Sequence, residues 1–129
     1  MGGCQLFSEK AMSDPGPRYP DSMTKGDIFD VQVFRDSTTL RFTNTTTHDF
    51  GPSVVWLNQR YSQPINGLAS AETIEMDLKL FVDEFGETYR AGGFFSQRVP
   101  APVVLCQLET EINNETQLVG FVVVENNLD

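Results

Sequence analysis

Between residues 26 and 125 the chain alternates apolar and polar residues in short runs, and turn residues separate these runs. The runs recur roughly every 8–14 residues, which is the spacing typical of a β-sandwich or barrel. No stretch repeats its apolar residues with the period of a capped helix. The pattern therefore predicts an all-β fold of about seven strands, near Ile28–Arg35, Thr38–Asn44, Ser53–Gln59, Ile74–Val82, Glu87–Ser96, Val103–Glu111 and Thr116–Glu125.

The clearest alternation belongs to the fourth of these predicted strands. Ile74, Met76, Leu78, Leu80 and Val82 share one face, and the residues between them are polar or charged. Successive side chains of a strand point to opposite faces of its sheet, so this spacing predicts a strand with one buried and one solvated face.

Two connections differ in regularity. Tyr61–Ala71 contains Pro64 and Gly67, and it predicts an irregular crossing between sheets. Asp83–Gly86 predicts a hairpin turn in which Gly86 takes a left-handed conformation.

The first 25 residues differ in composition from the rest of the chain. Asp14-Pro15-Gly16-Pro17 and Pro20-Asp21-Ser22 are too rich in proline and glycine for a helix or strand. Such composition is typical of a flexible linker. We therefore predict a flexible, disordered N-terminal tether over residues 1–25 and one folded domain over residues 26–125.

The order of signals resembles an immunoglobulin or fibronectin type III domain over about a hundred residues. Trp56 lies on the third predicted strand and Cys106 on the sixth, where such domains carry a core tryptophan and their second core cysteine. Phe42 occupies the region of the missing partner cysteine. The resemblance implies an immunoglobulin-like antiparallel β-sandwich with a core centred on Phe42, Trp56 and Cys106. A small barrel or jelly roll is the alternative.

Charge narrows the classes of partner. The chain has 18 acidic and 9 basic residues and a formal net charge of −9. Binding to nucleic acid or to an anionic lipid surface requires clustered lysine and arginine, so both are disfavoured. No apolar run approaches the ~20 residues that cross a bilayer as a helix. The membrane is therefore expected only through a covalent lipid.

Cys4 is the candidate for that lipid. Gly2-Gly3-Cys4-Gln5-Leu6 resembles the end of a bacterial lipoprotein signal, in which small residues precede the cysteine that is acylated. The resemblance implies a lipoprotein of the bacterial cell envelope, at the outer membrane or in the periplasm. Gln5 in place of aspartate favours the outer membrane. The alternatives for Cys4 are a free thiol and a disulfide with Cys106.

Other chemistry-bearing residues form no convincing catalytic set. His48-Asp49 lacks an embedded nucleophile, and the single histidine of the chain disfavours a zinc site. Asp83, Glu84 and Glu87 match no calcium-loop spacing. Cys106 lies in an apolar run and is expected to be an inert core thiol. We predict no enzymatic activity, no metal and no cofactor.

Aromatic residues supply the remaining candidate site. Phe94 and Phe95 are adjacent on one predicted strand and must point to opposite faces. Phe95 with Tyr61 and Tyr89 would form an exposed surface for a ligand, unless a loop covers that face. The sequence thus predicts a non-enzymatic envelope module that binds a protein partner or supports an assembly. The alternative is a carbohydrate-binding domain. The oligomeric state stays open.

Overall fold

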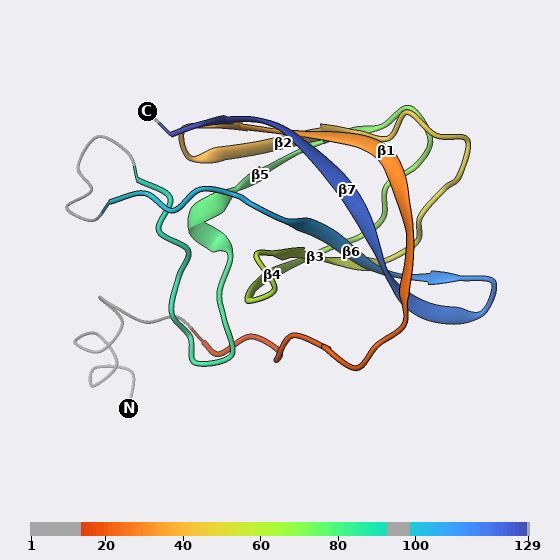
Figure 1. The fold of residues 1–129 in the computed structure, drawn as a ribbon, viewed down its shortest axis with the longest axis horizontal. Coiled ribbons are helices and arrows are strands. Elements are labelled where there is room, and N and C mark those ends of the chain that lie inside the picture. The colour runs from red at the N-terminus through yellow and green to blue at the C-terminus, as the bar shows by residue number, and fades with distance from the viewer. Residues whose placement is uncertain (1–13, 93–98, 129) are drawn as a thin grey trace.

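The computed structural model describes residues 14–92 and 99–128. These residues form seven strands and one short 3-10 turn, and the prediction of an all-β fold of about seven strands is confirmed (Figure 1). No helix among the described residues has the length and apolar character needed to cross a membrane. The elements are β1 (Lys25–Asp36), β2 (Thr39–Thr43), β3 (Ser53–Leu57), β4 (Tyr61–Ile65), β5 (Thr73–Asp77), η1 (Leu78–Leu80), β6 (Cys106–Ile112) and β7 (Glu115–Asn127).

The seven strands form one mixed sheet in the order β4-β3-β6-β7-β1-β2-β5, which curls into a half-barrel (Figure 1). All neighbouring pairs are antiparallel except β1 and β7, which run parallel. The prediction of a wholly antiparallel arrangement was therefore wrong at this pair. β1 and β7 are the longest strands, with 12 and 13 residues, and their pairing joins the two halves of the sheet. Register shifts along this pair increase the local twist and help the sheet to bend.

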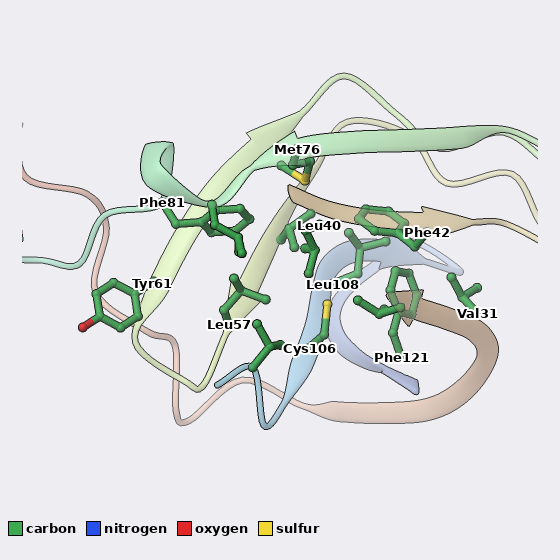
Figure 2. Close-up of a cluster of buried hydrophobic side chains, with 14 of the residues drawn as sticks. Val31, Leu40, Phe42, Leu57, Tyr61, Met76, Phe81, Cys106, Leu108 and Phe121 are labelled. Carbon is green, nitrogen blue, oxygen red and sulfur yellow. The ribbon is translucent and has the colours of Figure 1, made fainter. Parts of the chain in front are cut away.

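The hydrophobic core fills the concave side of the sheet (Figure 2). Phe42 and Cys106 are fully buried there, as the sequence predicts, and Phe42 packs against Phe121 with ring centroids 5.7 Å apart. Trp56 is also buried but lies on the opposite face, because Val55 and Leu57 on either side of it point into the core. The prediction that Trp56 centres the same core was wrong for this reason.

Three predicted elements differ from the structure. Tyr61–Ala71 is not wholly irregular, because its first five residues form β4. The strand predicted over Ile74–Val82 ends at Asp77, whose side chain accepts a hydrogen bond from the Lys79 backbone N–H and caps η1, and this leaves Leu80 60% exposed. In the described part of Glu87–Ser96 there is no strand, and only Glu87 and Thr88 take part in isolated bridges. Residues 93–96 lie outside the described residues.

Residues 14–24, which we call the strap, pack on the convex side of the sheet. The Gly16 N–H donates to the Asp83 carbonyl at 2.8 Å, and the Leu118 N–H donates to the Thr24 carbonyl at 2.9 Å. A Cβ at Gly16 would lie 2.9 Å from a Val82 methyl carbon, so this close approach requires glycine. The ordered fold therefore includes residues that composition assigns to the tether.

Candidate functional site

A cleft of about 270 Å³ opens where the strap, the β3–β4 turn and the turn after η1 meet. Figure 1 shows the start of the strap beside the second of these turns. The strap supplies Arg18, Tyr19 and Asp21, the β3–β4 turn supplies Gln59 and Arg60, and the turn after η1 supplies Asp83, Glu84 and Phe85. We call the site lined by these eight residues the cleft.

The β3–β4 turn is held in a defined conformation. The Arg60 N–H donates to the Leu57 carbonyl at 3.1 Å and closes a tight turn. Its two central residues, Asn58 and Gln59, have left-handed φ values of 54° and 58°. The Asn58 side-chain oxygen accepts hydrogen bonds from the backbone N–H groups of Val104 and Leu105, at 2.7 and 3.1 Å. Its amide nitrogen donates to the Pro102 carbonyl at 2.9 Å. The turn that presents Gln59 to the cleft is thus fixed from its inner side.

Asp83 organises the opposite wall of the cleft. Its side chain is 1% exposed, and Oδ1 accepts hydrogen bonds from the backbone N–H groups of Phe85 and Glu87, at 2.9 and 2.8 Å. These bonds close the hairpin turn that the sequence predicts, with Gly86 at a φ of 83°. The turn places Phe85 at its tip, where the residue is 68% exposed.

Arg60 links the two turns. Its Nε donates to Asp83 Oδ2 at 3.0 Å, and its Nη2 lies 2.9 Å from the same oxygen and 2.5 Å from Glu87 Oε1. The guanidinium group therefore occupies the position at which the acidic turn would otherwise hold a cation. Among residues 14–92 and 99–128 no group of three or more metal-ligating side chains is present.

The fold stabilises the ionised form of Asp83. Burial alone would raise the pKa of Asp83, but hydrogen bonds from the Glu87 and Phe85 backbone and from Arg60 outweigh it and hold the pKa below the ordinary value. The resulting stabilisation is fully present above the unfolded-state pKa of about 3.9, and it is lost as the pH falls through the lower folded-state pKa.

We expect Asp83→Asn to be less stable than the parent chain at pH 7, with the difference narrowing as the pH falls below about 4. Urea unfolding at a series of pH values measures this. Glu84→Gln is the matched control, because Glu84 is exposed at the same turn. It should keep the pH profile of the parent chain. If the profile of Asp83→Asn also runs parallel to that of the parent at every pH, the assigned role of Asp83 is wrong.

The part of the strap that lines the cleft is joined to the sheet by an aromatic contact. The Tyr19 ring packs edge-on against Trp56 with centroids 5.3 Å apart, and the Tyr19 hydroxyl donates to Gln107 Oε1 at 2.8 Å. Trp56 Nε1 in turn donates to Glu109 Oε1 at 2.8 Å. The strap therefore covers the buried Trp56 of β3. Through Tyr19, Trp56 connects the wall of the cleft to the sheet.

The tyrosines predicted to form an exposed ligand surface are in the interior. Tyr61 and Tyr89 do meet, with ring centroids 5.0 Å apart, but they are only 8% and 3% exposed. The Tyr89 hydroxyl donates to the Ala101 carbonyl at 2.8 Å. Guanidinium groups cover the two rings: Arg60 lies 4.9 Å from the Tyr61 ring centroid, and Arg35 lies 5.8 Å from that of Tyr89. Phe95 and Cys4 lie outside the described residues.

The other candidate groups serve the fold. His48 packs against Phe50 with ring centroids 4.7 Å apart, and Asp49 Oδ1 accepts the Ser70 N–H at 2.7 Å. Cys106 is a buried free thiol, and burial raises its pKa to about 12. A thiol with this pKa is protonated at neutral pH and is a poor nucleophile.

Comparison of the chain with protein-family models, curated proteins and solved structures finds no match.

Proposed function

We propose that the chain is a non-enzymatic binding or structural module of the bacterial cell envelope, with an immunoglobulin-like domain held by a lipid on Cys4. The strap is the observation that carries this proposal. It runs from the cleft along the convex side of the sheet into β1, so the described chain begins beside the cleft. An anchor on Cys4 would hold the cleft close to the surface to which the lipid is attached.

The number of residues between Cys4 and the described fold limits the distance between the lipid and the domain. Ten residue steps separate Cys4 from Asp14, the first described residue. A fully extended chain spans at most about 3.3–3.6 Å per residue, so the fold would begin within about 35 Å of the anchored cysteine. A tether of this length suits a domain that works near its membrane.

The strand order supports the immunoglobulin-like part of the proposal. In such domains the first, second and fifth strands share one sheet, and the third, sixth and seventh share the other. Here β1, β2 and β5 are neighbours at one side of the sheet, and β3, β6 and β7 are neighbours at the other. The parallel β1–β7 pair joins what would otherwise be two layers, and β4 lies beside β3.

The use of the reactive side chains supports a non-enzymatic role. The Cys106 thiol is sealed in the core, and Asp83 is neutralised by Arg60. His48 is half-buried against Phe29 and Phe50. These three groups are occupied by packing or pairing, whereas Arg18, Gln59 and Glu84 at the cleft are exposed. A surface of that kind suits binding.

Acylation of Cys4 tests the proposal directly. The full gene, with its own upstream codons, is expressed in bacteria fed an alkyne fatty acid, and the protein is examined by click labelling and intact mass. We expect a labelled, membrane-associated protein, loss of label in Cys4→Ser, and retained label in the matched control Cys106→Ser. An unlabelled parent protein, or label that persists in Cys4→Ser, contradicts the proposal.

A further inference from the structure

We propose that the cleft binds a neutral carbohydrate, with one sugar ring stacked on Phe85 and its hydroxyl groups bonded to the polar side chains around it. This inference rests on the proposed role of the domain as a binding module and names its ligand class. It moves the carbohydrate site from the buried pair Tyr61 and Tyr89 to the exposed ring of Phe85, whose turn is held by hydrogen bonds.

Phe85 has the properties of a stacking platform. It is 68% exposed, although transfer of a phenylalanine ring out of water is favourable. Its backbone N–H is bonded to Asp83 Oδ1 at 2.9 Å, and Asp83 is itself fixed by Arg60. An exposed ring on a fixed turn offers an apolar face that the C–H face of a pyranose can cover at little entropic cost.

Polar side chains of the right kind surround this ring. Arg18, Asp21, Gln59 and Glu84 all line the cleft and are exposed. Their side chains make no hydrogen bond or ion pair with the rest of the described chain. A guanidinium donates, a carboxylate accepts and an amide does both, whereas a sugar hydroxyl can donate and accept. The set therefore matches neighbouring hydroxyl groups of one ring.

The charge of the cleft selects a neutral ligand. Arg60 is compensated by Asp83 and Glu87, so Arg18 is the one lining cation without a paired acid within the described chain. Asp21 and Glu84 oppose it, and the whole chain carries −9. A phosphate, sulfate or uronate would be repelled by this field. The volume of about 270 Å³ lies just below the common range for small-molecule sites, which suits one or two sugar rings.

The structure also supplies a signal for binding. Tyr19 lines the cleft and contacts Trp56, the single tryptophan of the chain. A ligand that touches Tyr19 alters the surroundings of that indole. Binding should therefore change the tryptophan fluorescence without any added label.

The test uses the full chain and four neutral trisaccharides, namely maltotriose, cellotriose, mannotriose and chitotriose, with trigalacturonate as the anionic comparison. Binding is followed by Trp56 fluorescence and by calorimetry. We expect at least one neutral trisaccharide to bind. Because salt screens only charge interactions, the affinity should change little when the salt concentration is raised. Phe85→Ala should weaken that binding by about tenfold or more, because the stacking face is lost.

Val124→Ala is the matched control, since Val124 is an exposed apolar residue on β7 outside the cleft, and it should bind like the parent. Three results overturn the inference: no neutral trisaccharide binds, only trigalacturonate binds, or Phe85→Ala binds as well as the parent. Acylation of Cys4 is measured independently of sugar binding. Failure of the ligand class is therefore distinguishable from failure of the envelope role.

Discussion

Arg35→Ala should lower the free energy of unfolding by about 3 kcal/mol, because three backbone carbonyl groups lose a charged donor. The Arg35 side chain is fully buried at the end of β1. Its Nε donates to the Ser37 carbonyl at 2.9 Å, its Nη2 donates to the Ala91 carbonyl at 2.8 Å, and its Nη1 donates to the Ala101 carbonyl. No carboxylate of the described residues pairs with it.

The cost follows from the balance between burial and hydrogen bonding. Burial lowers the pKa of Arg35, whereas the nearby Tyr89 raises it. Hydrogen bonds to the carbonyl groups offset the desolvation of the charged guanidinium group. In Arg35→Ala the Ala91 and Ala101 carbonyls would lose their hydrogen-bond donor, and this loss destabilises the fold. Those two residues lie on either side of residues 93–98, so Arg35 also fixes both ends of this connection.

Urea unfolding measures the effect, and Arg41→Ala is the matched control. Arg41 is exposed on β2, and its guanidinium stacks over Phe34 at 4.9 Å from the ring centroid. Loss of such a surface contact should change stability by no more than about 0.5 kcal/mol. Arg35→Lys should fall between the parent and Arg35→Ala, because one ammonium group cannot reach three carbonyls with the geometry of a guanidinium fork. Equal losses in the two alanine variants would refute the assigned role.

Arg35 also illustrates how far alternation along the chain can be trusted. The pattern of β1 places Phe29, Val31 and Val33 on one face, and all three contribute to the core. Arg35 continues that parity and is buried with them. The period of two thus predicts direction correctly even where the residue is charged. The hydrogen bonds that make this burial tolerable come from Ala91 and Ala101, far along the chain, and no local pattern contains them.

The same limit explains the errors in β3 and β5. The immunoglobulin-like resemblance places Trp56 in the main core, and the residue is buried, with 1% of its surface exposed. Its burial is provided by Tyr19 of the strap, on the face opposite Val55. Leu80 keeps the alternation of β5, but Asp77 ends the strand by capping η1. At Leu80 a side-chain cap overrides the periodic signal. Trp56 obeys the alternation of β3, and only a non-sequential contact covers it.

The cleft could be predicted only in part. The sequence predicts the hairpin turn at Asp83–Gly86, and the structure contains it. Arg18 and Arg60 were missed, since only the fold brings the strap beside the two turns. One usable signal was present: Phe85 is an apolar residue at the tip of a polar turn, where nothing local can bury it.

Phe42→Ala should lower the free energy of unfolding by about 3–5 kcal/mol, the usual cost of removing a buried phenylalanine ring. Phe42 is fully buried on β2 against Phe121 of β7, two strands away across β1. This contact exists only because the sheet curls, so the variant tests the concave core directly. Figure 2 shows both rings inside it.

Phe85→Ala is the control for Phe42→Ala, because it removes the same atoms from an exposed ring. Its unfolding free energy should stay within about 0.5 kcal/mol of the parent in urea. A large loss would mean that Phe85 packs against the fold, and weaker sugar binding by Phe85→Ala could then be assigned to unfolding. A small loss for Phe42→Ala would mean that the sheet does not close over that ring. The two phenylalanine variants thus separate the residue that stabilises the half-barrel from the residue that the half-barrel exposes for binding.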